Sequence, residues 1–247
     1  MAQKYYLAAH EEQRGTGAYA TTNCAAASGA MLVDQATLGI RDPGVGYFRN
    51  LTDDTEGGLQ MGQVASVLEE DFGLEVRLYD YDDNLKWSRL VRYLNHGCFA
   101  VVAGDYDVLP PKLQGADYDG FHAVMYHQRF VKNQRVGDPL LKRWVKWPNE
   151  LAYKYVMKFD RQVDGGIHAA IMIPQYAKLR SGVLKAAIRA EPSKGSEAIA
   201  TMTSVQKIVT GGTVKGEVIA GVKLWRKVWV SSTASFGYIH WTQTWQD

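Results

Sequence analysis

The chain has 247 residues, of which 46% are hydrophobic and 22% are charged. This composition is that of an ordinary globular protein with a sizeable buried core. The net charge is only +2, but residues 1–173 carry 18 Lys and Arg against 22 Asp and Glu, whereas residues 174–247 carry 10 against 4. The uneven charge favours two units with different electrostatic roles over a single uniform domain.

Several classes of protein are excluded by the same totals. The only cysteines are Cys24 and Cys98, which are too few for a disulfide scaffold and lack the paired spacing of a zinc site, although one 24–98 disulfide is left open. No segment approaches the ~18 consecutive apolar residues that a membrane span needs. The opening MAQKYYLAAHEEQR lacks the apolar run of a signal peptide. We therefore expect a chain made in the cytoplasm, without membrane, metal or cofactor.

Three helices are predicted in the first half of the chain. Residues 25–37 are rich in helix formers, with Ala27 and Met31 at helical spacing. Residues 41–58 contain turn signals and are expected to form a loop. Two further helices are predicted at 59–71 and 84–94, each followed by a glycine.

Strands are predicted to follow these helices. Short apolar or alternating runs, separated by Gly, Pro, Asp and Asn, occur at residues 98–103, 121–127, 134–137 and 167–173. Helices first and antiparallel strands afterwards are typical of an α+β domain, which we place at residues 1–173.

The last part of the chain has a different pattern. Residues 174–182 are expected to be a linker, and residues 183–247 a second unit without helices. Its strand candidates lie between glycines and predict a small all-β barrel; they are residues 209–212, 218–222, 225–230 and 237–241.

Cys24 stands at the expected start of the first helix. Unpaired N–H groups and the positive end of the helix dipole stabilise a thiolate at this position, and the thiolate is the reactive form of cysteine. The alternative is a buried structural thiol, which is the commoner role of a free cysteine. This segment alone does not distinguish a reactive thiol from a structural one.

A histidine and an acid favour the reactive interpretation. His122 begins an apolar strand in GFHAV, and Asp138 ends the next strand in RVGDP. Neighbouring strands can bring the two side chains together. A base that deprotonates the thiol, oriented by a third side chain, is what acyl transfer at neutral pH requires.

These motifs carry a resemblance to a known family. Cys24-Ala25-Ala26-Ala27 opening a helix, GFHAVM around His122, and VGDP around Asp138 followed by a Trp-rich stretch resemble the papain-like cysteine peptidases of the bacteriocin-processing (C39-like) type. The resemblance covers about residues 15–160. It implies that Cys24 is the nucleophile, His122 the general base and then acid, and Asp138 the group that orients the imidazole.

The sequence departs from that family at the oxyanion donor. The family carries a Gln five or six residues before the cysteine, where this chain has Tyr19 and Ala18. Gln13 is the nearest upstream Gln and could serve only if the intervening loop folds back. Asn23 is a local substitute, and the Cys24 backbone N–H is a donor that needs no particular side chain.

Other residues could compete for these roles. His168 imitates the setting of His122, but no acid follows it closely, so a structural histidine is the favoured interpretation. His127 lies an odd number of residues from His122 and is expected on the opposite face of the strand. Cys98 is expected in the core. The acidic groups at 80–83 and 105–119 lack the spacing of a calcium-binding loop and are interpreted as solvated.

Residues 183–247 are similar to bacterial SH3-like domains. The similarity rests on Arg189-Ala-Glu-Pro-Ser, a glycine-rich middle, Trp225-Arg-Lys-Val and the closing Gly237-Tyr-Ile-His-Trp. It implies attachment to bacterial cell-wall peptide or polymer. The positive charge and the aromatic residues independently suit an anionic polymer or a stacked ligand, and the predicted binding residues are Trp225, Trp229, Tyr238 and Trp241.

Together these features predict a peptidoglycan hydrolase, a cysteine endopeptidase or amidase of the phage endolysin kind. Such a lysin is expected to stay in the host cytoplasm until its release and then to act at the cell wall. Two alternatives are a tail-associated lysin or processing peptidase, and a non-catalytic wall-binding virion protein. Nucleic acid is not expected as a partner, because the second unit lacks a dense Arg/Lys stripe; the oligomeric state is open.

Overall fold

The computed structural model describes residues 7–13, 22–52, 57–80, 83–115, 118, 120–163 and 166–246. The chain divides into two compact units. The first comprises residues 9–33 and 42–173 and is called the α+β unit here. The second groups residues 1–8 and 34–41 with 174–247 and is called the all-β unit, after its strands.

The helices of the described chain lie in the α+β unit, except that the last turn of the first helix, residues 34–37, is grouped with the all-β unit. They are α1 (Cys24–Thr37), α2 (Gly44–Asn50), α3 (Met61–Glu70), α4 (Trp87–Asn95) and α5 (Asn149–Val163), with two short 3₁₀ turns, η1 (Tyr106–Val108) and η2 (Pro111–Leu113). The three predicted helices are α1, α3 and α4. The segment expected to be a loop contains α2, and α5 was not expected. None of the described helices is long and apolar enough to span a membrane.

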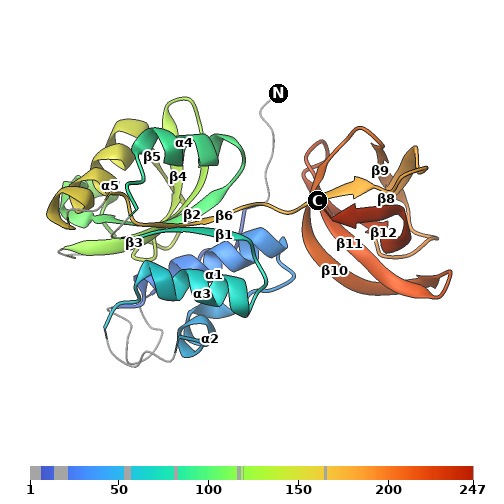
Figure 1. The fold of residues 1–247 in the computed structure, drawn as a ribbon, viewed down its shortest axis with the longest axis horizontal. Coiled ribbons are helices and arrows are strands. Elements are labelled where there is room, and N and C mark those ends of the chain that lie inside the picture. Colours follow the sequence, from blue (N-terminus) through green and yellow to red (C-terminus); the bar gives the residue numbers. More distant parts are fainter. Residues whose placement is uncertain are drawn as a thin grey trace. The chain divides into compact units, whose positions relative to one another are not determined.

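A six-stranded antiparallel sheet forms the centre of this unit. Its strands are β1 (Val76–Tyr79), β2 (Phe99–Asp105), β3 (Phe121–Arg129), β4 (Asn133–Gly137), β5 (Val145–Pro148) and β6 (Ala169–Met172), in the order β1-β6-β2-β3-β4-β5. Figure 1 shows α4 and α5 over one face of the sheet and α1 and α3 under the other. The fold is therefore α+β, as the sequence predicts.

The face under α4 and α5 carries a continuous apolar core. Val102, Val124, Trp147 and Tyr155 are fully buried there, with many other side chains of β2, β3 and α5. Gly104 is required for this packing, because a Cβ at residue 104 would lie 2.2 Å from the Tyr155 ring. Tyr155 can therefore cross β2 close to the strand that carries His122.

Helix α1 lies on the opposite face and is buried almost all round. Ala26, Ala27 and Leu32 have no exposed surface. Its Met31 packs so closely on β4 that a Cβ at Gly137 would lie 2.9 Å from the Met31 sulfur. Because the helix is buried on nearly every side, the residue at its first turn has a fixed position relative to the sheet.

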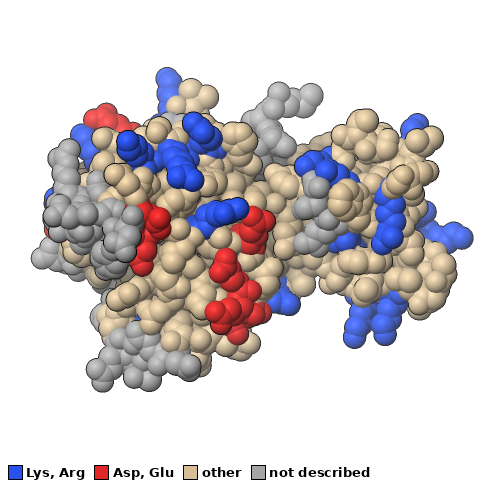
Figure 2. Space-filling view, viewed as in Figure 1, with Lys and Arg blue, Asp and Glu red and all other residues tan. Residues whose placement is uncertain are grey.

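The all-β unit is a seven-stranded sheet. Its strands are β7 (Tyr176–Leu179), β8 (Lys185–Arg189), β9 (Ala198–Thr203), β10 (Ile208–Ile219), β11 (Val222–Val230), β12 (Ser235–His240) and β13 (Thr244–Gln246), with the 3₁₀ turn η3 (Trp241–Gln243), in the order β13-β7-β10-β11-β12-β8-β9. The buried side chains at its centre include Ile188, Met202, Val228 and Ile239. On the face shown in Figure 2, Lys and Arg side chains are spread over this unit.

Two sequence predictions for this unit are wrong. Residues 174–182 are not a linker, because Tyr176–Leu179 forms β7, which pairs with both β10 and β13. Ala177 and Leu179 alternate inward and are buried, which explains why this short run joins the sheet. Residues 218–222 are not one strand either. Val218 and Ile219 end β10, Val222 begins β11, and Ala220 and Gly221, both with positive φ, form the turn between them.

Candidate active site

Cys24 is the first residue of α1, at the end of the helix where backbone N–H groups lack intrahelical partners. Its side chain is partly exposed, and both cysteines are free thiols. The Ala27 N–H donates to the Asn23 carbonyl at 2.9 Å, so the helical hydrogen bonding begins just before Cys24. The thiol therefore lies where the helix dipole favours the thiolate.

His122 and Asp138 form a buried pair behind this thiol. His122 Nε2 and Asp138 Oδ1 are 2.9 Å apart, and both side chains are fully buried. The carboxylate accepts, so His122 Nε2 carries the proton and Nδ1 is the ring nitrogen left for the thiol. Cys24 and His122 line the same pocket and are close enough for each to shift the pKa of the other. The structure thus brings the three predicted residues together in the order Cys24, His122, Asp138.

The pKa values of Cys24 and His122 are shifted in opposite directions. Burial alone would raise the pKa of Cys24, but the neighbouring His122 imidazole, with the backbone groups of Ala123 and Ala25, outweighs it and lowers that pKa. Burial would likewise lower the pKa of His122, yet its hydrogen bond to Asp138 and the neighbouring Cys24 thiol raise it to about 9. Both shifts favour a thiolate beside an imidazolium.

Asp138 is held in place by groups that the sequence did not indicate. The Tyr106 hydroxyl donates to Asp138 Oδ2 at 2.8 Å, and the Leu140 backbone N–H donates to Oδ1 at 3.0 Å. His10 Nε2 donates to the Asp138 carbonyl at 3.0 Å. Tyr106 belongs to η1 and also lies edge-on to the His122 ring, at 4.8 Å between centroids. No local motif marks Tyr106, because its partner is far along the chain.

Two further contacts fix the nucleophile relative to the base. The Ser28 hydroxyl, one turn after Cys24, donates to the Ala123 carbonyl at 3.2 Å and so ties α1 to β3. The Tyr155 hydroxyl of α5 donates to the His122 carbonyl from the other side of the sheet. The strand carrying His122 is therefore anchored on both faces.

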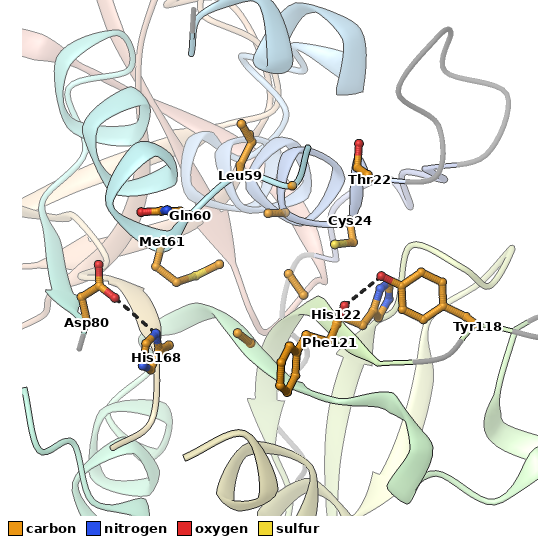
Figure 3. Close-up of a pocket in the computed structure, with 14 residues that line it drawn as sticks. Thr22, Cys24, Leu59, Gln60, Met61, Asp80, Tyr118, Phe121, His122 and His168 are labelled. Carbon is orange, nitrogen blue, oxygen red and sulfur yellow. Dashed lines mark hydrogen bonds and ion pairs between the residues drawn. The ribbon is translucent and has the colours of Figure 1, made fainter. Parts of the chain in front are cut away.

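A pocket of about 340 Å³ opens at Cys24 and His122. Figure 3 shows these two residues at one end and Asp80 with His168 at the other. Its remaining lining is mostly apolar or uncharged: Thr22, Ala25, Gly58, Leu59, Gln60, Met61, Ala103, Tyr118, Phe121 and Ala123. Tyr118 lies beside His122, and burial followed by the negative charge of Cys24 raises its pKa to about 12. This volume is in the range of small-molecule and peptide sites.

The two predicted oxyanion side chains lie near the site but not on the pocket surface. Gln13 is buried, and its backbone N–H donates to the Pro139 carbonyl at 3.0 Å, next to Asp138. Asn23 is also buried. Neither is among the described residues that line the pocket. The Cys24 backbone N–H remains the donor that its position at the helix start supplies.

The competing residues have structural surroundings, with one exception. Cys98 is buried, and desolvation raises its pKa to about 11. His127 is buried between Phe99 and Trp144, at 4.8 and 5.5 Å between ring centroids. His168 is the exception, because it pairs with Asp80 inside the pocket. Within the described residues, no group of three or more His, Cys, Asp or Glu could hold a metal ion; Asp82, Asp117 and Asp119 lie outside them.

The predicted wall-binding aromatic residues are less exposed than expected. Trp225 is only 2% exposed, and its indole N–H donates to the Glu217 carbonyl at 3.0 Å, so the ring belongs to the core. The others are half-buried: Trp229 packs edge-on against Phe236, Tyr238 lies on β12, and Trp241 lies under the Arg226 guanidinium at 4.0 Å. A unit this small has few residues to fill its interior, so its large rings are used there. The prediction that Trp225 binds the wall is therefore wrong.

A different aromatic and basic surface lies around β7. Trp245 is 47% exposed, and the Lys178 ammonium lies 5.3 Å from its ring centroid. The Lys207 ammonium lies 6.0 Å from the Tyr176 ring centroid. Lys178 pairs with Trp245 across β7 and β13, and Tyr176 is two residues from Lys178, so these side chains share the outward side of the sheet. We call these four residues the β7 face.

No protein-family model and no curated protein matches the chain. Among solved structures, it is similar to a candidate C39-like peptidase from Bacillus anthracis, with 13% identity, 62% of this chain and 88% of that chain covered, and a TM-score of 0.45. It is also similar to Ly7917, with 11% identity, 99% and 93% coverage and a TM-score of 0.25. The structure of Ly7917 with the hydrolyzing product of MDP gives the same identity and coverage and a TM-score of 0.27.

Proposed function

We propose that this protein is a cysteine endopeptidase or amidase that cleaves an amide bond in the peptide stem or cross-bridge of bacterial peptidoglycan, as phage endolysins do. The observation that carries the catalytic part is the buried His122–Asp138 pair, 2.9 Å apart, in the same pocket as a partly exposed thiol at a helix start. This is the nucleophile, base and orienting group of covalent acyl transfer.

The proposed reaction has two halves. The Cys24 thiolate attacks the amide carbonyl carbon, and the oxygen, now negative, accepts a hydrogen bond from the Cys24 backbone N–H. The His122 imidazolium donates its proton to the leaving nitrogen, the C–N bond breaks and a thioester remains. Neutral His122 then takes a proton from water, the hydroxide attacks the thioester, and the Cys24 thiolate leaves as the acid product forms.

The buried pair also favours an enzyme over the non-catalytic alternative. Removing an imidazole and a carboxylate from water costs several kcal/mol unless they are paired and hydrogen-bonded. Asp138 uses both carboxylate oxygens in such bonds, to His122 and Leu140 through one and to Tyr106 through the other. A protein that only binds walls would have no use for this arrangement beside a partly exposed thiol.

We propose that the all-β unit attaches the enzyme to the wall, in line with its sequence similarity to bacterial SH3-like domains. The β7 face supports this role, because it combines an exposed indole with lysines, which suits an anionic polymer or a stacked sugar or peptide. Attachment raises the effective concentration of substrate at Cys24 without changing the chemistry. In this account the protein stays in the host cytoplasm until it is released to the wall.

The experiment that tests the proposed bond is digestion of purified Gram-positive cell walls. Mass spectrometry of the soluble fragments should show one new amine and one new carboxylate for each bond cut, with the glycan strands intact. Cys98→Ala serves as the matched control and should give the same fragments, because that thiol is buried away from the pocket. Release of reducing sugar ends instead of amines would contradict the proposal.

A further inference from the structure

A second histidine–aspartate pair lies in the same pocket as Cys24. Tyr79 at the end of β1 is opposite Ala169 at the start of β6, so the next residue, Asp80, faces the preceding one, His168. Asp80 Oδ1 and His168 Nδ1 are 3.2 Å apart. Both residues line the pocket, at the end away from Cys24 (Figure 3).

The two members of this pair differ in exposure. The His168 side chain is 4% exposed, while the Asp80 side chain is 28% exposed. The imidazole therefore lies behind the carboxylate and holds it, and the carboxylate is the group that reaches the pocket. Asp83 Oδ2 accepts the Asp80 backbone N–H at 3.4 Å, which adds a second acidic side chain at this end.

The middle of the pocket is apolar. Leu59, Met61 and Phe121 lie between the two ends in Figure 3. A ligand that fills the pocket would thus meet the thiol at one end, apolar side chains along its length and a carboxylate at the other end. Ligand sites of this type use a few fixed polar groups for orientation and specificity.

The sheet order gives the approximate length of such a ligand. The strands from β3 to β1 follow the order β3-β2-β6-β1. At a spacing of about 4.8 Å between neighbours, the end of β1 lies ~14 Å along the sheet from β3. A fully extended chain spans about 3.5 Å per residue. A peptide of about three or four residues can therefore reach from Cys24 to Asp80.

We propose that Asp80, positioned by His168, determines specificity by binding an ammonium group of the substrate about three residues from the scissile bond. This inference rests on the proposed function and deepens it: the preferred substrate is a short peptide branch that ends in a free amine, rather than a continuous, capped chain. A carboxylate held by a buried donor and facing an apolar pocket is complementary to an ammonium group, since charge-assisted hydrogen bonds are the strong ones.

The test uses irreversible peptide probes and does not depend on cell walls. Oligoalanyl acyloxymethyl ketones of two, three and four residues, each with a free amine and as its N-acetyl twin, would be compared at pH 6.5, where an α-amine is protonated. Intact-protein mass spectrometry measures the rate of Cys24 alkylation. At the length that reaches Asp80, the free-amine probe should react about 10-fold to 100-fold faster than its acetylated twin.

The variant Asp80→Asn should abolish that preference, so that the free-amine and acetylated probes react at the same rate, and its circular-dichroism spectrum and Tm should match those of the unaltered protein, which shows that the variant is folded. Asp83→Asn is the matched control and should retain the preference. Equal rates for free and acetylated probes at every length, or an Asp80→Asn variant slowed equally with both, would overturn the inference. Failure of every probe to alkylate Cys24 would instead overturn the nucleophile assignment on which the inference rests.

Discussion

The Tyr106 hydroxyl donates to Asp138 Oδ2 at 2.8 Å, the carboxylate oxygen that does not hold His122. Replacing Tyr106 by Phe keeps the ring but removes this donor, so Asp138 loses one of the groups that fix its orientation. We expect kcat to fall about 10-fold, as for loss of a hydrogen bond to a charged group, with KM unchanged because Tyr106 does not line the pocket. Steady-state kinetics on a soluble peptide substrate measure both parameters.

Tyr126→Phe is the matched control for that substitution. Tyr126 is another fully buried tyrosine of the same core, and its hydroxyl donates to the Ala152 carbonyl at 2.9 Å, away from Asp138. Tyr126→Phe should lower the free energy of unfolding by about as much as Tyr106→Phe does, but it should not change kcat. Equal kcat losses in the two variants would mean that Tyr106 acts only through stability.

The pH dependence of kcat/KM should follow the thiolate–imidazolium pair. The active form needs Cys24 deprotonated and His122 protonated, so activity should rise as pH increases through the lowered pKa of Cys24 and fall as pH passes about 9, the raised pKa of His122. Because Asp138 helps to raise the His122 pKa, Asp138→Asn should move the alkaline limb to lower pH. An alkaline limb unmoved in this variant would contradict the assignment of His122.

Gly104→Ala should destabilise the α+β unit, because the added methyl group would overlap the Tyr155 ring. We expect a loss of about 1–3 kcal/mol, as for overpacked cores, measured by urea denaturation. Gly46→Ala in α2 is the control. A Cβ there meets nothing within 4 Å, and its replacement should leave stability unchanged or raise it by up to about 1 kcal/mol. Equal stability of the two variants would contradict this prediction, because it would mean that the Tyr155 ring moves aside without lowering the free energy of unfolding.

Removing the β7 face should weaken attachment to walls without affecting the catalytic chemistry. The double change Lys178→Ala and Trp245→Ala removes an exposed indole and the ammonium that lies over it. In sedimentation with purified walls we expect binding about 10-fold weaker, in line with the loss of a stacking residue, and an unchanged rate on a soluble peptide. Trp229→Ala provides the comparison and should bind walls as the unaltered protein does. If Trp229→Ala bound more weakly and the double variant did not, the binding site would lie on β11 instead of the β7 face.

The sequence is enough to predict the parts of the site that depend on local pattern. Cys24 begins a run of helix formers, and His122 and Asp138 stand at strand ends, so their coming together in one site can be predicted without coordinates. Tyr106 could not be found in this way, because its hydrogen bond to Asp138 joins residues 32 positions apart. The same applies to Asp80 and His168, which meet only through the register of β1 and β6.

Helix α5 and strand β7 were not predicted from the sequence, and only α5 has a pattern by which it could have been found. Helix α5 has an i,i+4 pair, Glu150 and Lys154 at 3.0 Å, and buried Ala152, Tyr155 and Val156 at helical spacing, so its signal was present in the sequence. Strand β7 is too short for a reliable pattern. It forms because β10 and β13 supply partners on both sides, which is tertiary information.

The most direct test of the central claim is the rate at which Cys24→Ala clears a suspension of Gram-positive cell walls, followed by turbidity. The account predicts a loss of activity by at least about 1000-fold, since the thiolate forms the covalent intermediate, while Cys98→Ala clears walls as the unaltered protein does. Binding of Cys24→Ala to the walls should be unchanged, which separates loss of chemistry from loss of attachment. If Cys24→Ala cleared the walls as fast as the unaltered chain, Cys24 would not be the nucleophile.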